Sequence, residues 1–553
     1  MAEPSDAPKV TPLRRTWLIL KPDTNDIAIV FVFALVVGLL TMATPLAVES
    51  LVNTVAFGRV IQPIIVLSTI LLTFLSFQAA VRLLQVYVIE LMQRRIFARA
   101  AADLVHRLPR IRYQALDTVD LPVLVNQFLD VAQVQKTAAS LLLEGSGILL
   151  STLVGMVVLA FYHPWLLGFD LVLLAAVAFI FMVAGIGAVR TSVKESKAKY
   201  RALGWFEEMA EHPVLFRSTP GFSLSLDRAN TLVGEYLRYR SKHFRILIRQ
   251  NALALALQAV ASTVLLGIGG WLVITSRLTL GQLVAAELIV AIIVGSFAKL
   301  GKLLETYYDL LASADKVGGL TDLPEEHVGC AELHEGPLPV EAERVTFAFP
   351  GRPACVSGLS FDIEPGGSTA VLGRSGSGKS TLCDLVAGLR HPTGGHVTVD
   401  GVEPDEVSPF TLRDCVRIVR DGGLISGTVL QNVAVGNPLV GVREAWDALR
   451  GVGMEDAIRS LPDGIYQTIG GPSTPLSAGE RARLAVAREA ASRPGVLIID
   501  GMLDVLSDGE AAEIIQWLRG PDAGWTLIVA TSRPEIARQF ASVVDLDRIG
   551  VMS

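Results

Sequence analysis

The chain has 553 residues, more than one ordinary domain holds, and 51% of them are hydrophobic while only 18% are charged. The mean hydropathy of +0.48 predicts membrane spans, and the net charge of −6 argues against a nucleic-acid partner, which requires a basic face. The four cysteines (Cys330, Cys355, Cys383 and Cys415) show no CxxC spacing, so we expect reduced thiols in a cytosolic domain rather than a metal site.

The first part of the chain carries the hydrophobicity. We expect residues 1–25 to be a cytoplasmic N-terminal segment, because their apolar run is too short for a secretory signal. Between 26 and 320, six apolar stretches are each long enough to cross roughly 30 Å of hydrocarbon, which takes about 20 residues. They are 26–48, 61–81, 141–161, 164–189, 251–275 and 280–300. We therefore expect an all-α transmembrane domain of six helices, paired through short links and joined by long helical links at about 82–140 and 190–250.

Charge predicts the orientation of these helices. Lys and Arg are concentrated in the two long links and in the N-terminal segment. Positive charge stays on the cytoplasmic side, so both termini and both long links are expected there. Of three acidic residues in or near the spans, Glu144 and Asp170 are expected near interfaces or facing the helix bundle. Glu287 lies deeper in its span and is the better candidate for facing a substrate cavity.

The character of the chain changes after residue 320. Residues 321–337 are rich in Pro, Gly and Glu, which predicts a linker. From 338 to 553, short β-branched runs at 397–400, 496–500 and 526–531 alternate with helical stretches. This alternation predicts an α/β domain with a largely parallel sheet.

The most specific motif is VLGRSGSGKST at 371–381, an apolar strand that runs into a glycine-rich turn and then a helix. Glycines allow successive backbone N–H groups to converge on phosphate oxygens, and the helix N-terminus adds positive partial charge. Lys379 is expected to reach the β- and γ-phosphates, with Ser380 and Asp500, at the end of VLIID, as ligands of Mg²⁺. The predicted ATP contacts in this loop are Gly373, Arg374, Ser375, Gly376, Ser377, Gly378, Lys379, Ser380 and Thr381.

The segment PLSAGERARLAVAREAASRPGVLIID, which ends at Asp500, resembles the signature segment of ABC ATPases. Together with the six-span layout, it makes the chain similar to an ABC exporter half-transporter: a type I exporter-like transmembrane domain fused to a P-loop ATPase domain. The resemblance implies a dimer in which each ATP lies between one chain's P-loop and the other chain's signature. Here the signature is Leu476, Ser477, Ala478, Gly479 and Glu480. Phe349 resembles the aromatic residue that stacks on adenine, although an ordinary core aromatic is the alternative.

The same resemblance shows which groups this chain lacks. The catalytic Glu of the family follows the magnesium Asp, and Gly501 stands there instead. Ser532 replaces the switch His, Arg420 is the nearest match to the loop Gln, and Ser507 stands where the family has Asp. A positioned general base contributes about 10²–10⁴ in rate. We therefore expect no intact catalytic residue at this chain's own site, while the P-loop still binds ATP and Mg²⁺.

These features predict one half of an unequal pair in a bacterial cell (inner) membrane. The chain would hold ATP without hydrolysis, and its signature would complete the hydrolytic site of a competent second half-transporter, with a homodimer as the other possibility. Such a pair would export a peptide, lipid or other small amphipathic substrate, and segments 109–128 and 204–221 of the long links would dock on ATPase domains. The alternatives are a non-transporting ATP-binding membrane sensor or regulatory subunit and a slow homodimeric exporter.

Overall fold

A computed structural model describes residues 11–57, 61–119, 121–183, 185–470, 476–521 and 523–549. These residues form two compact units. The helical unit comprises 11–109 and 119–323, and the α/β unit comprises 110–118 together with the chain from 324 onward.

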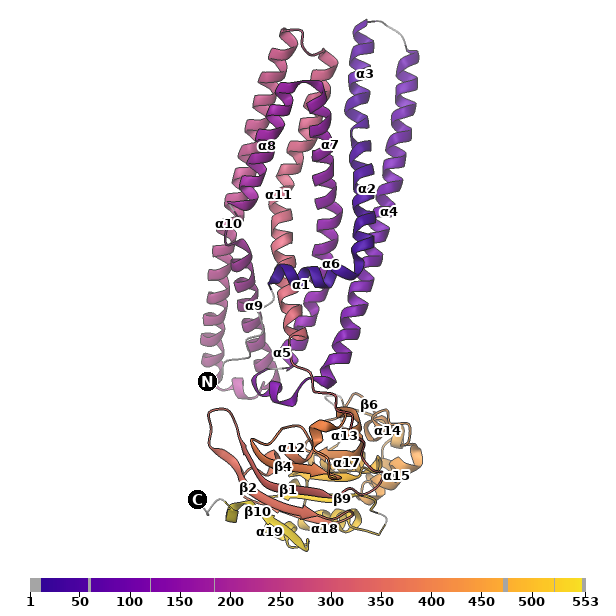
Figure 1. The fold of residues 1–553 in the computed structure, drawn as a ribbon, viewed down its shortest axis with the longest axis vertical. Helices are drawn as coiled ribbons and strands as arrows, with labels where there is room; N and C mark the ends of the chain where they lie inside the picture. Colours follow the sequence, from indigo (N-terminus) through magenta and orange to yellow (C-terminus); the bar gives the residue numbers. More distant parts are fainter. Residues whose placement is uncertain are drawn as a thin grey trace. The chain divides into compact units, whose positions relative to one another are not determined.

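Long helices that run side by side make up most of the helical unit (Figure 1). They are α2 (Thr24–Thr41), α3 (Ala43–Phe57), α4 (Gln62–Arg107), α7 (Ser146–Tyr162), α8 (Pro164–Met182), α9 (Ala188–Glu211), α10 (Thr219–Ile274) and α11 (Leu280–Thr321), with the shorter α1 (Pro12–Leu20), α5 (Leu121–Asn126), α6 (Asp130–Ser140) and a π-helical turn, η5 (Leu141–Gly145).

The six predicted apolar stretches lie mainly on these helices, although 164–189 extends past the end of α8 at Met182. Within the described residues, four helical segments are long and apolar enough to cross a membrane, namely Pro12–Thr54, Gln62–Arg110, Gln127–Tyr162 and Thr219–Ile274, and shorter apolar helices cover Pro164–Ile180 and Leu280–Ile293. The first stretch is divided at Met42, between α2 and α3. Pro45 follows this break, and a proline that lacks an N–H cannot continue the hydrogen-bond pattern of the preceding helix. The helix count therefore agrees with the sequence.

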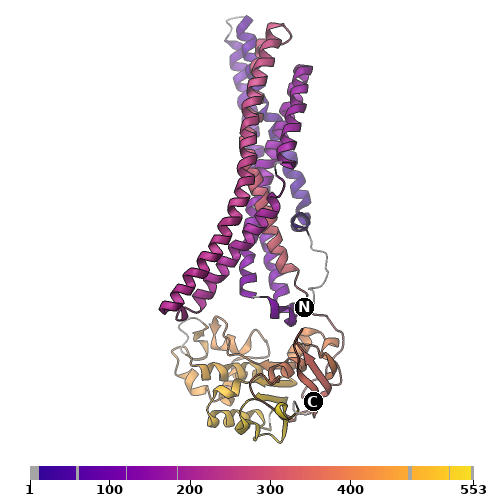
Figure 2. The ribbon, with the colours of Figure 1, turned by 90° about the vertical axis from the view of Figure 1, so that its left-hand side faces the viewer.

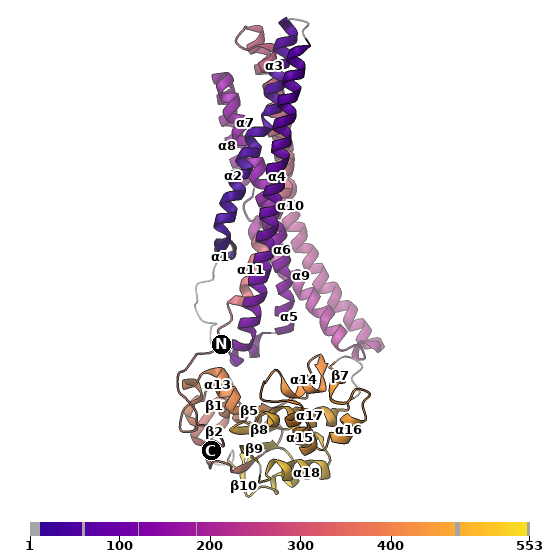
Figure 3. The same cartoon turned by 90° about the vertical axis from the view of Figure 1, so that its right-hand side faces the viewer.

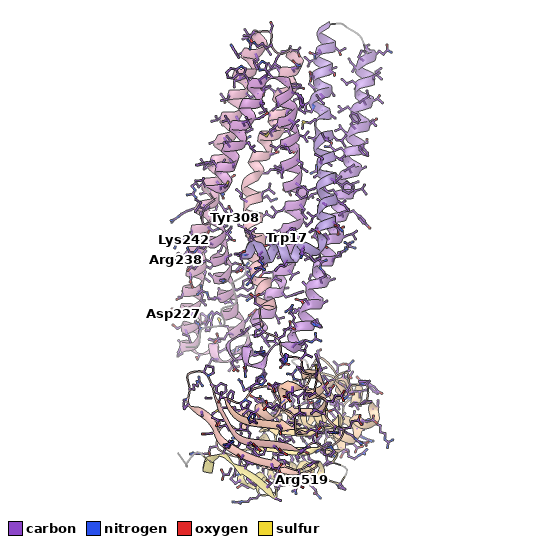
Figure 4. The ribbon with its side chains drawn as sticks, viewed as in Figure 1. Trp17, Asp227, Arg238, Lys242, Tyr308 and Arg519 are labelled. Carbon is purple, nitrogen blue, oxygen red and sulfur yellow. The ribbon has the colours of Figure 1, made fainter. Side chains whose placement is uncertain are left out.

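The short helix α1 was not predicted from the sequence. It lies across the direction of the long helices (Figure 1), and Figure 4 labels Trp17 on it. Thr11 caps its first turn, and Leu13, Trp17 and Leu18 are more than half exposed. A short helix with exposed Trp and Leu side chains suits the interface between water and lipid.

The helices α9 and α10 pack against each other and diverge at one end from the rest of the helical unit (Figures 2 and 3). The turn between them needs a glycine, because a Cβ atom on Gly221 would lie 2.5 Å from the Leu215 carbonyl oxygen. Trp205 packs edge to face on Phe216, with the ring centroids 5.4 Å apart. Of the predicted docking segments, 204–221 therefore forms the end of this helix pair within the helical unit.

Two larger sheets form the α/β unit (Figure 1). The antiparallel sheet has the order β2-β1-β4, the parallel sheet has the order β10-β3-β9-β8-β5, and β6 pairs with β7. The strands are β1 (Val340–Ala348), β2 (Ala354–Ile363), β3 (Ser368–Leu372), β4 (Gly394–Val399), β5 (Val416–Val419), β6 (Gly427–Thr428), β7 (Thr468–Ile469), β8 (Val496–Asp500), β9 (Thr526–Thr531) and β10 (Ser542–Asp545); the helices used below are α12 (Lys379–Val386), α17 (Ala478–Ala491), α18 (Asp508–Leu518) and α20 (Leu546–Ile549).

The parallel sheet confirms the predicted α/β class. The runs at 496–500 and 526–531 are its neighbouring strands β8 and β9, which are buried along their whole length, as expected for strands covered on both faces. The run at 397–400 contributes β4 to the second sheet, where β4 pairs antiparallel with β1. Alternation of strands and helices along the chain does not say which sheet a strand joins.

The strand register brings the ends of four strands together. Leu372 pairs with Thr531, Asp500 with Ala530, and Val419 with Ile499. The loops that follow β3, β5, β8 and β9 therefore begin side by side at the carboxyl edge of the sheet. This edge is where open α/β sheets bind their ligands.

The segment Arg110–Thr118 belongs to the α/β unit although it lies between helices α4 and α5 in the chain. The Arg112 N–H donates to the Pro324 carbonyl at 2.9 Å, and the Glu326 N–H donates to the Arg110 carbonyl at 2.8 Å. The structure thus confirms that part of the predicted docking segment 109–128 docks on the α/β domain.

Candidate nucleotide site

The glycine-rich loop after β3 has the backbone that phosphate binding requires. Gly376 and Gly378 have φ values of +84° and +97°, which favour glycine. A Cβ atom on Gly378 would also lie 2.6 Å from the Cys355 carbonyl oxygen. Helix α12 begins at Lys379 directly after this turn, so its free N–H groups face the loop.

The side chains of this loop leave polar groups available for a phosphate. Lys379 Nζ donates to the carbonyls of Gly373 and Arg374 at 2.7 and 2.8 Å, and Arg374 is held by Asp547 of α20. Ser377 Oγ is buried without a hydrogen-bond partner in the described part of the chain. Backbone donors, one lysine and an orphaned buried hydroxyl fit the phosphates of a nucleotide.

The structure brings the two predicted metal ligands together. Ser380 Oγ donates to Asp500 Oδ1 at 3.0 Å. The second oxygen of this carboxylate accepts from Arg420 Nε at 2.8 Å. Asp500 is only 7% exposed, and neighbouring side chains bind both of its carboxylate oxygens.

Arg420, which follows β5, lies at the centre of a larger network. Its Nη2 is 2.7 Å from Asp384 Oδ1 and donates to the Ser380 carbonyl at 3.1 Å, and its Nη1 donates to Tyr113 Oη at 3.2 Å. Burial alone would lower the pKa of Arg420, but the nearby carboxylates of Asp384 and Asp500 outweigh burial and raise it above its usual value. The guanidinium is therefore a permanent cation beside Asp500.

This cation decides whether a magnesium ion fits between Ser380 and Asp500. Mg²⁺ binds oxygen at about 2.0–2.1 Å, so an ion on Asp500 would lie only a few ångströms from the guanidinium. At roughly 4 Å and an effective dielectric constant of about 20, a divalent and a monovalent cation repel by about 8 kcal/mol. With Arg420 in this position, the residues do not fit a magnesium ion.

Gly501 leaves the position beside Asp500 without a carboxylate. Its φ is +70°, and its N–H donates to the Ala530 carbonyl at 3.0 Å. A Cβ atom built on it meets nothing within 4 Å. The backbone conformation, not a lack of space, is what favours glycine at this position.

Ser532 follows β9 and points to the loop after β8. Its N–H and Oγ both donate to Asp504 Oδ2, at 2.9 and 2.7 Å, and Thr531 Oγ1 donates to the other oxygen of the same carboxylate. Arg533 forms an ion pair with Asp508. Sequence reasoning missed Asp504, which ties the two loops together; its position four residues after Asp500 gave no signal of this role.

The predicted signature forms the start of helix α17. Ser477 is the N-cap: its Oγ accepts from the Glu480 N–H at 3.2 Å, and its N–H donates to Glu480 Oε2 at 2.7 Å. This capping box explains an acidic residue at position 480, and the hydrogen bonds from the Ser477 backbone and side chain lower the pKa of its carboxyl. Leu476 is buried beneath the turn, while Ala478 and Gly479 begin the helix.

Phe349, the predicted adenine-stacking residue, directly follows β1, the central strand of the antiparallel sheet. Its ring packs edge to face on Phe347, and Arg390 Cζ lies 5.0 Å from its centroid. Arg390 is 7% exposed and binds Asp117 through two hydrogen bonds of 2.7 and 2.8 Å and Asp384 through one of 3.0 Å. These long-range partners were not predicted from the sequence.

The three acidic residues of the spans differ in their surroundings. Asp170 in α8 is 2% exposed, and neither of its carboxylate oxygens has a hydrogen-bond partner among the described residues. One oxygen of Glu287 in α11 is also buried without such a partner, and Glu144 lies in the π-helical turn. The burial of Asp170 agrees with the expectation that it faces the helix bundle, and the assignment of Glu287 to a substrate cavity stays a prediction.

Comparisons with known proteins agree with this architecture. A family model described as ABC transporter matches residues 356–503, and one described as ABC transporter transmembrane region matches residues 27–209. A solved structure of a bacterial Atm1-family ABC exporter with ATP bound has the same fold, with a TM-score of 0.82 and 20% identity over 95% of this chain and 94% of that chain.

Two curated relatives match part of the sequence. The mycobactin import ATP-binding/permease protein IrtB of Mycolicibacterium thermoresistibile is 29% identical over 286 residues, which are 51% of this chain and 48% of that protein. The leukotoxin translocation ATP-binding protein LktB of Mannheimia glucosida is 28% identical over 320 residues, which are 57% of this chain and 44% of that protein. The chain thus spans about half the length of the curated relatives it matches.

Proposed function

We propose that this chain, which belongs to the ABC transporters and fuses an N-terminal transmembrane domain of exporter type to an ABC ATPase domain, binds ATP at its own P-loop without hydrolysing it. The observation that carries this proposal is Gly501, which leaves no carboxylate beside Asp500 to activate a water molecule. Ser532 adds to it, because its hydroxyl is bound to Asp504.

The second part of the proposal is an unequal pair. The Ser477 hydroxyl and the N–H groups of Ala478 and Gly479, which the capping box with Glu480 does not use, would receive the γ-phosphate of an ATP bound to a partner's P-loop. A competent half-transporter with an intact catalytic Glu would hydrolyse that ATP. The ATP on this chain would act as a lasting clamp, because a ligand shifts a conformational equilibrium through its differential affinity and needs no hydrolysis to do so.

The membrane helices support a transport role rather than a sensor alone. The chain is a multi-pass membrane protein, and the basic long links place both termini on the cytoplasmic side of a bacterial inner membrane in this proposal. We propose a peptide, lipid or other small amphipathic molecule as the substrate. One relative is named for import and the other for translocation, so direction is part of what must be measured.

The test uses the purified full chain in lipid nanodiscs, alone and together with a co-purified half-transporter. Alone, the chain should bind ATP and release phosphate at well below about one per second, the low end of ordinary enzyme turnover. The Lys379→Ala variant is the control that should lose ATP binding. A turnover above that rate for the chain alone would contradict the proposal, and failure to recover a competent partner from native membranes would favour a homodimer or a sensor.

A further inference from the structure

We propose that Arg420 takes the place of magnesium in this chain, so that its P-loop binds metal-free ATP with the guanidinium as the fixed countercation. This inference rests on the proposed function, because it requires ATP at this P-loop. It concerns a different property, the metal dependence of binding, and it is independent of whether the ATP is cleaved.

The first argument is the position of the guanidinium. Ser380 and Asp500 are the two groups that the sequence predicts as metal ligands. Arg420 Nε binds one Asp500 oxygen at 2.8 Å, and Arg420 Nη2 binds the Ser380 carbonyl at 3.1 Å. The other Asp500 oxygen accepts from Ser380 Oγ. The positive charge that a metal would supply is therefore already present where these groups meet.

The second argument is that the guanidinium is held firmly. Asp384 Oδ1 lies 2.7 Å from Nη2, and Tyr113 Oη accepts from Nη1 at 3.2 Å. Asp384 is itself 4% exposed and is bound through its other oxygen to Arg390 Nε at 3.0 Å. Contacts from α12, β8 and the segment 110–118 thus hold Arg420 from several sides, and a side chain fixed in this way does not leave easily for an incoming ion.

The third argument is chemical. A guanidinium is a planar set of N–H donors that binds phosphate oxygens well and stays charged at every physiological pH. It has no lone pair to offer, so it can neither accept a hydrogen bond nor coordinate a metal. A glutamine amide at the same position could offer an oxygen to Mg²⁺, whereas Arg420 can only repel it. The replacement therefore changes the cation that accompanies the nucleotide from a diffusible ion to a side chain.

Two variants separate this role from a merely structural one. Arg420→Lys keeps a positive charge beside Asp500. Arg420→Gln removes the charge and supplies an amide oxygen. Asp384→Asn serves as the matched control, because it removes an ion-pair partner of Arg420 but leaves the cation beside Asp500.

The experiment measures the affinity of the full chain in nanodiscs for ATP, in EDTA and in excess Mg²⁺, by displacement of a fluorescent ATP analogue. The affinity for ATP should differ by less than about threefold between the two conditions for the wild type, Arg420→Lys and Asp384→Asn. Arg420→Gln should bind ATP at least about tenfold more tightly in Mg²⁺ than in EDTA. Mn²⁺ is the second probe: in the presence of ATP, its electron paramagnetic resonance spectrum should show protein-bound metal for Arg420→Gln and none for the wild type. This spectrum also tests the wild type when a variant does not fold.

The outcomes distinguish the two proposals. Wild-type binding that requires Mg²⁺, or a protein-bound Mn²⁺ signal in the wild type, would overturn this inference and leave the non-hydrolytic site intact. An Arg420→Lys variant that behaves like Arg420→Gln would overturn the role of the charge. Metal-independent binding combined with brisk hydrolysis by the chain alone would overturn the proposed function only, and the absence of ATP binding in both conditions would overturn both.

Discussion

Introducing a carboxylate beside Asp500, by the substitution Gly501→Glu, tests how much of the catalytic deficit lies at one position. Gly501 has a φ of +70°, and this left-handed conformation costs other residues about 1–2 kcal/mol. No atom lies within 4 Å of the new Cβ, so this strain is the main expected cost. For a domain of about 200 residues, it corresponds to a fall in Tm of roughly 2–8 °C.

The gain in rate should be small. A general base supplies about 10²–10⁴ when the rest of the site is in place. Here the Ser532 hydroxyl is bound to Asp504, and Arg420 occupies the second oxygen of Asp500. Phosphate release by Gly501→Glu in nanodiscs should therefore stay below about one per second at saturating ATP. Adding Arg420→Gln and Ser532→His should raise it by at least about tenfold over the single variant, since each restores a group that acts on the same phosphate.

The matched control is Gly501→Ala, which carries the same backbone strain without a carboxylate. Its Tm should fall by the same amount as that of Gly501→Glu, and its phosphate release should equal that of the wild type. Turnover of Gly501→Glu alone above about one per second would show that the missing base was the whole defect. An unchanged Tm for Gly501→Ala would refute the strain argument.

Three further predictions concern other contacts of the α/β unit. Asp117→Asn weakens the two-hydrogen-bond pair with Arg390, which holds the pKa of Asp117 below its usual value. The protection factors of the amides in 110–118, which correct each exchange rate for its intrinsic pH dependence, should fall in Asp117→Asn, and in the wild type they should fall only below about pH 4. Protection factors unchanged by the substitution and by low pH would contradict the assigned contact. Ser507→Ala removes the N-cap of α18 and should lower the free energy of unfolding by about 1 kcal/mol, or the Tm by roughly 2–4 °C. An unchanged melting curve would show that this cap does not stabilise the domain. Ser477→Ala should slow phosphate release by a co-purified pair while leaving the ATP affinity of this chain's own P-loop unchanged. If phosphate release and that affinity fell equally, Ser477 would not act at the partner's ATP site.

The parts of the site that were predictable from sequence are those built from neighbouring residues. The glycine-rich loop, Asp500 at the end of a buried strand and the start of α17 are local patterns with a physical reason for each residue. The partners of Arg420 are not local, because Asp500 and Tyr113 lie 80 and 307 positions away. A single sequence names the unusual arginine, but only the fold shows what it touches.

The helical unit shows the same division. Long apolar stretches predicted the membrane helices, because hydrocarbon thickness sets their length. The helix α1 escaped prediction because it has only nine residues and an exposed apolar face, neither of which produces a strong hydropathy signal. The second, antiparallel sheet was not predicted, because the pairing of β4 with β1 depends on contacts between distant parts of the chain. The degree of burial of Asp170 likewise depends on how the helices pack.

The segment Arg110–Thr118 has a mechanical consequence. It is folded with the α/β unit, yet in the chain it lies between α4 and α5 of the helical unit, so the chain joins the two units here as well as near residue 324. Tyr113 places its hydroxyl against the same guanidinium that touches Asp500. A change at Arg420 therefore acts first on this segment, whose two ends continue along the chain towards α4 and α5.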